Sequence, residues 1–214
     1  MTHPRANTYL HVTWISRYLT GDKSCLWACW FKGNYQGYQK IPSDFDSARW
    51  NMEHTDLLNE LVAELEEQGC ELFIERQNSF RVVSRRSGAV IGGKPDLIAV
   101  FPDGRTVVYD VKTGHESASH IVQVQLYMYL LPLSDLKRWK DKDRKLEGAV
   151  VYRDGHHVDI PADSIDDASV ARVTDFIQKM TSDMPPRRVA SLAECGFCEL
   201  TKTDCPERID AGVA

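Results

Sequence analysis

The sequence predicts a mixed α/β fold whose core runs in the order helix, three strands, helix, strand. Three observations support this class: apolar residues first recur with helical spacing, then form alternating or continuous apolar runs, and then recur with helical spacing again before a proline. The chain has 214 residues, of which 43% are apolar and 27% charged. We therefore expect one globular core with at most a small appendage.

The first predicted helix covers residues 50–68. Its apolar positions follow a helical repeat and are Leu57, Leu58, Leu61, Val62 and Leu65. Gly69 follows as a natural C-terminal stop. His54 lies about one turn before the first of these leucines, so the spacing places it on the same inward face.

Extended segments are predicted after this helix, at residues 71–77, 79–84, 90–101 and 106–112. Between the last two segments, residues 102–105 read Pro-Asp-Gly-Arg. Proline, aspartate and glycine suit the backbone angles of a tight turn. We therefore expect the last two segments to form a hairpin.

The second half of the chain completes the expected core. A helix is predicted at residues 119–131, ending before Pro132, followed by a strand at 148–153 and a further helix at 168–180. The predicted organisation has three parts: an N-terminal helical segment (1–50), the α/β core (51–182) and a C-terminal cysteine-bearing segment (183–214).

Charge and hydropathy argue against some functional classes. The formal net charge is −5, which disfavours binding to nucleic acid by bulk electrostatics alone. Residues 137–145 hold six basic and two acidic side chains, and their simplest interpretation is a solvated loop. No run approaches the roughly 18 apolar residues of a membrane helix, and residues 1–10 lack the apolar region of a secretory signal. We expect a cytoplasmic protein without a membrane partner.

Two carboxylates and a lysine form the central candidate cluster. Asp96 follows Gly-Lys-Pro at the start of one predicted strand, and Asp110 lies near the end of the next. A hairpin can bring both to one hard divalent cation such as Mg²⁺ and leave positions for water and phosphate. Lys112 shares the strand face of Asp110 and could orient the attacking water. Each motif alone also occurs by chance, but a buried carboxylate needs a partner, either a metal ion or Lys112.

Two further kinds of side chain could complete this site. His54 could be a satisfied core histidine or a ligand of the ion, in which case Mn²⁺ would be tolerated better than Mg²⁺. On the second helix, two pairs have the i, i+4 spacing that puts them on shared faces: Gln123 with Tyr127, and Gln125 with Tyr129. One pair could hold a phosphate or the lysine, although such pairs are more often amphipathic surface. His115 and His120 are most simply loop histidines.

Six cysteines occur in two groups far apart in the chain. They are Cys25, Cys29, Cys70, Cys195, Cys198 and Cys205. A disulfide framework is disfavoured because the chain is large enough for a core of its own. Four thiolates, Cys25 with the last three, could bind Zn²⁺ or a [4Fe-4S] cluster. Cys29 could replace Cys25, and Cys70 is most simply a buried apolar thiol.

Together these residues resemble the PD-(D/E)XK nuclease superfamily. The order of His54, Gly93-Lys94-Pro95-Asp96, Asp110-Val111-Lys112, the Gln-x-x-x-Tyr helix and the split cysteines is closest to its RecB-like iron-sulfur branch. That branch includes the CRISPR adaptation exonucleases and the AddB nuclease domain. One departure is Asp110, where this branch often has the longer glutamate.

The resemblance implies a role for each matching position. It implies a restriction-endonuclease-like αβββαβ core with a mixed sheet, and a small iron-sulfur lobe formed by both termini. The implied metal ligands are His54, Asp96, Asp110 and the Val111 carbonyl. Lys112, Gln123 and Tyr127 would complete the catalytic set. The implied ligands of a structural [4Fe-4S] cluster are Cys25, Cys195, Cys198 and Cys205.

The implied activity is a Mg²⁺- or Mn²⁺-dependent DNA exonuclease that prefers single-stranded ends, in CRISPR adaptation or in DNA repair and recombination. Its partners would be DNA and proteins of those processes. The alternative is a catalytically silent nucleic-acid-binding or assembly module that keeps an iron-sulfur or zinc site. Cleavage of labelled DNA in the presence of Mg²⁺ or Mn²⁺ separates the two.

Overall fold

The computed structural model of the chain describes residues 1–141 and 143–210. Lys142 of the basic segment and residues 211–214 of the predicted C-terminal segment lie outside the described residues. The predicted division of the chain into three parts stays a prediction.

A five-stranded mixed sheet forms the centre of the molecule, with strand order β10-β9-β8-β7-β4. Its strands are β4 (Glu71–Ile74), β7 (Leu97–Val100), β8 (Thr106–Lys112), β9 (Glu147–Tyr152) and β10 (His157–Ile160). Only the β8–β9 pair in this sheet is parallel, and the other neighbouring strands are antiparallel. The predicted mixed α/β class is confirmed, and so is the hairpin, which joins β7 to β8.

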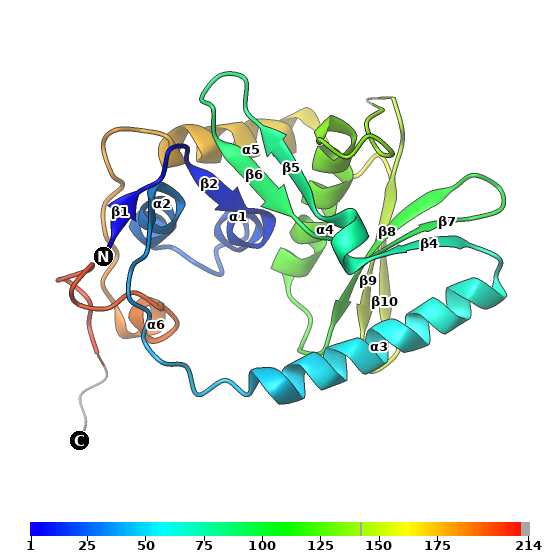
Figure 1. Cartoon of the computed structure of the whole chain (residues 1–214), viewed down its shortest axis with the longest axis horizontal. Helices are drawn as coiled ribbons and strands as arrows, with labels where there is room; N and C mark the ends of the chain where they lie inside the picture. The colour runs from blue at the N-terminus through cyan, green and yellow to red at the C-terminus, as the bar shows by residue number, and fades with distance from the viewer. Residues whose placement is uncertain (142, 211–214) are drawn as a thin grey trace.

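Two helices cover opposite faces of this sheet (Figure 1). On one face, leucines of α3 (Ser47–Glu67) pack against Leu97, Val107 and their alternate neighbours. On the other face, α4 (Ala118–Leu130) packs against Ile98 and Val108. Successive residues of a strand point to opposite faces, which explains this division. The order α3, β4, β7, β8, α4, β9 agrees with the predicted order of helix, three strands, helix and strand. The residues between β4 and β7 form an insertion that the prediction did not separate from this core.

Helix α3 begins three residues earlier than predicted, and α4 and α5 one residue earlier, because polar residues cap them. Asp46 accepts a hydrogen bond from the Arg49 N–H at the start of α3, Ser117 caps α4, and Asp166 caps α5 (Asp167–Met180). Side-chain oxygens at these positions satisfy N–H groups that the first helical turn leaves unpaired.

The prediction of one strand over residues 90–101 was wrong. The run is split into β6 (Val90–Gly93) and β7, which belong to different sheets. Proline lacks an N–H and interrupts a ladder, and Pro95 lies in the gap. Strand β6 pairs with β5 (Phe80–Val83) and with β2 (Tyr9–His11) in a three-stranded sheet.

The segment at residues 71–77 is also shorter than predicted. Strand β4 ends at Ile74, and a 3₁₀ turn, η1 (Glu75–Asn78), follows it. A second 3₁₀ turn, η2 (Leu131–Leu133), follows α4.

The N-terminal and C-terminal segments lie side by side (Figure 1). Their remaining elements are β1 (His3–Pro4), α1 (Val12–Leu19), α2 (Leu26–Asn34), β3 (Tyr35–Gln36) and α6 (Leu192–Gly196). Leu200 packs with Trp27 and Phe31 of α2, and a β-bridge joins it to Lys40. In the part of the chain that the structure describes, no helix is long and apolar enough to cross a membrane.

Candidate active site

A cavity of about 520 Å³ lies where the three-stranded sheet meets the start of β7 and the end of β8. Residues of β2, α1, α3, β5, β6, β8 and α4 line it. The predicted side chains in its lining are His54, Asp96, Asp110, Lys112, Gln123 and Tyr127. The structure therefore brings together, in one cavity, residues that span 74 positions of the sequence, from 54 to 127 counted inclusively.

Asp96 is held at the start of β7 by groups from two other elements. Its carboxyl oxygen Oδ2 accepts a hydrogen bond of 3.0 Å from the Val111 N–H of β8. The same oxygen lies 3.3 Å from Nε2 of His54, on α3. Asp96 is only 8% exposed, so these contacts satisfy a carboxylate that water hardly reaches.

Asp110 is more deeply buried, at 2% exposed, and its two carboxyl oxygens have different partners. Oδ2 pairs with the Lys112 ammonium two residues along the same face of β8. Oδ1 accepts a hydrogen bond of 3.1 Å from Nε2 of Gln123 on α4. Gln123 also donates to the Tyr127 hydroxyl at 2.9 Å. Helix α4 thereby orients the carboxylate on the sheet.

Burial and charge set the protonation states in this cluster. Burial raises the pKa of Asp110 to about 6, Lys112 opposes this shift, and Asp96 adds to it. Burial alone would lower the pKa of Lys112, but the carboxylates of Asp110 and Asp96 raise it above its ordinary value. Burial also raises the pKa of Tyr127 well above its usual range. Lys112 therefore remains a cation, and Tyr127 a neutral phenol, near neutral pH.

The strand register explains why the Val111 backbone faces Asp96. Leu97 pairs with Tyr109, and the same register continued by two residues sets Pro95 opposite Val111. In an antiparallel ladder, the N–H and carbonyl of one residue point to the same neighbouring strand. Proline has no N–H to donate to that carbonyl, while the Asp96 side chain accepts from the N–H. Because the Val111 N–H points to Asp96, its carbonyl points to the same side of β8.

The donor set suits a hard divalent cation: two carboxylates, a backbone carbonyl and an imidazole. The distances show one constraint. Among residues 1–141 and 143–210, no three His, Cys, Asp or Glu side chains are grouped tightly enough to hold one ion. His54 and Asp96 instead contact each other directly. An ion shared by these two side chains would take the place of this contact.

The alternative pair on α4 lies elsewhere. Gln125 and Tyr129 line a different cavity, and Nε2 of Gln125 donates to the Ser164 carbonyl at 3.3 Å. His115 is exposed. The prediction that His120 lies in a loop was wrong. It lies in the first turn of α4, with Nδ1 3.1 Å from the Tyr152 hydroxyl. Burial, and to a smaller extent the charge of Lys112, lowers the pKa of His120 to about 4.

Sequence reasoning missed several side chains that line the cavity. Tyr9 and His11 reach it from β2, Arg81 from β5, and Trp50 from the first turn of α3. Three of these residues belong to the three-stranded sheet. Its strands come from distant parts of the sequence, so no local sequence pattern indicates that these residues meet the cavity. Trp50 had a signal, since it stands one helical turn before His54.

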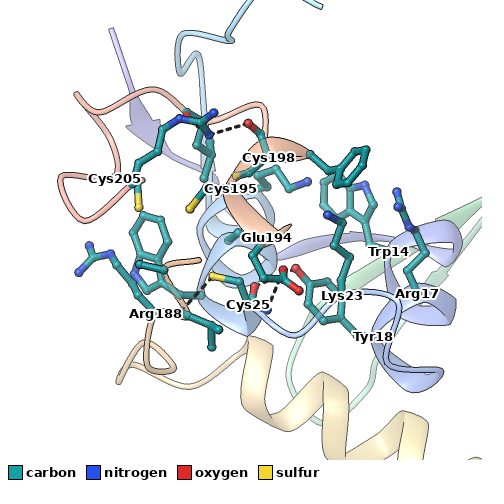
Figure 2. Close-up of a pocket in the computed structure, with 18 residues that line it drawn as sticks. Trp14, Arg17, Tyr18, Lys23, Cys25, Arg188, Glu194, Cys195, Cys198 and Cys205 are labelled. Atoms are coloured by element: carbon teal, nitrogen blue, oxygen red, sulfur yellow. Dashed lines mark hydrogen bonds between the residues drawn. The ribbon is translucent and has the colours of Figure 1, made fainter. Parts of the chain in front are cut away.

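The cysteines are divided between a second cavity and the hydrophobic packing. Cys25, Cys195, Cys198 and Cys205 line a cavity of about 80 Å³ between the N-terminal and C-terminal segments (Figure 2). Cys29 is fully buried in the main core instead. Cys70 packs at the edge of the cluster beneath α3. No disulfide joins any of these six cysteines, all of which the structure describes.

The second cavity has features that suit an anionic group. Its basic lining residues are Arg17, Lys23, Lys32, Arg188 and Arg208, against one acid, Glu194. The Val189 N–H donates to the Cys25 sulfur, and the Ile209 N–H donates to the Cys195 sulfur, both at 3.5 Å. In the described part of the chain, these thiols are not grouped closely enough to hold a single metal ion.

The mixed sheet, with two carboxylates and a lysine at one end of a β-hairpin, is consistent with the restriction-endonuclease-like fold of a class of nucleases. The chain belongs to the PD-(D/E)XK nuclease superfamily, whose family model matches residues 28–205. Members of this superfamily use divalent metal ions. The comparison with curated proteins found no match.

Two solved structures show a distant likeness to the chain. The crystal structure of SSO0001 is 18% identical, with a TM-score of 0.49, over 97% of this chain and 90% of that one. The alkaline exonuclease LHK-Exo from Laribacter hongkongensis is 14% identical, with a TM-score of 0.42, over 80% of this chain and 87% of that one. The family assignment therefore depends on the family model and not on these neighbours.

Proposed function

We propose that this protein is a Mg²⁺- or Mn²⁺-dependent deoxyribonuclease that hydrolyses phosphodiester bonds as an exonuclease on single-stranded ends. One observation supports the activity above all others: Asp96, Asp110 and Lys112 line the same cavity, with His54 touching Asp96 and Gln123 touching Asp110. Alternation along β8 and the turn after β7 explain how this cluster forms.

Each residue has a proposed role in that reaction. His54, Asp96, Asp110 and the Val111 carbonyl would hold the metal ion, which would polarise the phosphate and activate water. Lys112 orients the attacking water and stabilises negative charge that develops on the phosphate oxygens. Gln123 fixes the Asp110 carboxylate, and Tyr127 positions Gln123.

We further propose that Cys25, Cys195, Cys198 and Cys205 bind a structural [4Fe-4S] cluster. A cluster held by four thiolates is anionic, and the five basic side chains around the second cavity offset that charge. Backbone N–H groups that donate to the ligand sulfurs, such as those of Val189 and Ile209, stabilise thiolates. A cluster spans more space than one ion, so its ligands need not converge on one point.

The proposed partners are DNA and proteins of CRISPR adaptation or of DNA repair and recombination. The support for this setting is the motif order that the chain shares with the RecB-like iron-sulfur branch: histidine, Asp96, Asp110-x-Lys112 and the Gln-x-x-x-Tyr helix between split cysteines.

End-labelled DNA tests the activity. Single-stranded and duplex oligonucleotides, labelled at either end, are incubated with Mg²⁺ or Mn²⁺, and a chelator is then added. We expect stepwise shortening of single strands that stops on chelation. Asp96→Asn and Lys112→Ala should abolish it, while Asp159→Asn, an exposed carboxylate on β10, should not. Full activity in either site variant would contradict the assignment.

A further inference from the structure

Trp50 is an exposed aromatic side chain at the wall of the candidate active site. It is 40% exposed, and it is the one exposed large apolar residue in the described part of the chain that lines this cavity. Phe45, 63% exposed, has its ring 6.3 Å from the Trp50 ring. Together the two rings form an exposed aromatic surface beside the cavity.

The start of helix α3 places the Trp50 ring beside His54. The Asp46 side chain caps α3, and the Asp46 carbonyl accepts a hydrogen bond from the Trp50 N–H. On the next turn, the His54 ring lies 4.9 Å from the Trp50 ring at an interplanar angle of 35°. Through His54, which contacts Asp96, the indole ring adjoins the proposed metal ligands. An aromatic surface in the wall of this cavity is one on which a nucleobase can stack.

The charges around the cavity suit a nucleic-acid strand. Arg81 and Lys94 line it together with Lys112, so three cations face two carboxylates. A bound divalent ion would make the lining more positive. Phosphates flanking the scissile bond would therefore meet positive charge beside the aromatic surface.

We propose that Trp50, buttressed by Phe45, is the stacking platform for one unpaired base next to the scissile phosphate. This inference depends on the proposed DNA nuclease function and extends it to substrate form. Bases inside a duplex are already stacked on both faces and paired, so they must leave the helix to use such a platform. A base at a single-stranded end stacks at no such cost. The platform therefore selects single-stranded ends.

A double-mutant cycle between protein and DNA tests this proposal. Fluorescein-labelled single-stranded oligonucleotides, intact or with one abasic position moved along the strand, are bound to the chain in the Lys112→Ala background, and dissociation constants are measured. Trp50→Ala should weaken binding of intact DNA by about 5- to 150-fold. Trp50→Phe should restore most of the loss. Met52→Ala, on the same helix and 60% exposed, should leave binding unchanged.

The abasic series gives the decisive result. At one position, loss of the base should weaken binding by the Lys112→Ala chain as much as adding Trp50→Ala does. Combining both changes should weaken binding no more than either change alone. Additive losses at every position would overturn the platform. So would a Trp50→Ala variant that binds DNA normally but needs more Mn²⁺ for cleavage, because Trp50 would then only position His54.

Failure of the proposed function would look different. If the wild-type chain does not cleave DNA with Mg²⁺ or Mn²⁺, the nuclease assignment fails, whereas the binding cycle still reports whether Trp50 stacks on a base. In cleavage assays, Trp50→Ala should raise KM for single strands much more than it lowers kcat. An unchanged KM would contradict the platform even in an active enzyme.

Discussion

At the scale of single residues, Asp110 shows how a buried carboxylate is kept in position. Lys112 pairs with one oxygen, and Gln123 donates to the other. Gln123 is itself held by the Tyr127 hydroxyl. Where water is scarce, removing one partner of a hydrogen bond leaves the other polar group unsatisfied. The free-energy cost of this exceeds the average net contribution of a hydrogen bond to stability. A small change at Tyr127 should therefore disturb Gln123 and, through it, the position of the Asp110 carboxylate.

Tyr127→Phe removes the acceptor that Gln123 uses at 2.9 Å. We expect activity to fall about tenfold and the free energy of unfolding to fall by about 0.5–1.5 kcal/mol, since one buried hydrogen bond is lost. The measurements are kcat with Mn²⁺ and urea unfolding. The control is Tyr129→Phe, on the same helix but lining another cavity. An equal loss of activity in the control would contradict the role of Tyr127.

His54→Ala should alter the metal requirement. The imidazole contacts Asp96, and its removal deletes one proposed ligand and leaves that carboxylate less well oriented. We expect the Mn²⁺ concentration for half-maximal cleavage to rise at least about tenfold. His115→Ala, at an exposed position, is the control. An unchanged Mn²⁺ titration in His54→Ala would remove this residue from the ligand set.

The predictability of the site differs between its residues. Asp96, Asp110 and Lys112 could be placed together because a short turn and strand alternation are local rules. The sequence alone could not decide whether Gln123 or Gln125 faces the site. The packing of α4 on β8 decides it, because it turns Gln123 toward Asp110. Arg81 could not be found, because the sheet that carries it pairs with the N-terminal β2.

At the scale of elements, helix α4 must approach β9 closely to present Gln123. Gly148 of β9 allows this approach. A Cβ atom there would lie 2.4 Å from Cγ1 of Val124 and 2.7 Å from Sδ of Met128. Such overlap forces neighbouring side chains or the helix to move.

Gly148→Ala should therefore lower the free energy of unfolding by about 1–3 kcal/mol and should also reduce cleavage, because α4 carries Gln123 and Tyr127. Denaturant unfolding and kcat are the two measurements. Gly114→Ala is the control, since a methyl group there would meet no described atom within 4 Å. Loss of stability without any change in kcat would show that the site tolerates movement of α4.

Local sequence patterns predicted most elements, and their failures have a common cause. Helices α3, α4 and α5 were found because their apolar spacing is regular, with errors only at the caps. Residues 90–101 look like one strand in composition, yet β6 and β7 join different sheets. Pairing with strands far away in the sequence decides where this run is split. Pro95 was the one local feature that indicated a break.

At the scale of the whole molecule, the cysteine cavity connects the two ends of the chain. Cys25 adjoins α2, and the other three ligands lie between residues 195 and 205. A cluster would cross-link segments some 170 residues apart in sequence, and such a link stabilises chiefly by restricting the unfolded chain. The spacing of these cysteines predicted their shared cavity, although it could not separate Cys25 from Cys29.

Cys198→Ser should lower the iron and sulfide content from about four of each per chain, bleach the visible absorption and lower the thermal midpoint. Anaerobic purification, metal analysis and thermal unfolding measure these changes. Cys70→Ser, outside this cavity, should keep both iron and colour. Zinc in place of iron in the wild-type chain would contradict the proposed cluster.

The central claim is that Asp96 and Asp110 share one metal ion. Crystals of the chain grown with Mn²⁺ and measured at the manganese absorption edge test it most directly. We expect one anomalous peak in the active-site cavity, about 2.0–2.5 Å from oxygens of both carboxylates, and no such peak in Asp96→Asn. A Mn²⁺ concentration that saturates cleavage but leaves no peak between these two side chains would contradict the claim.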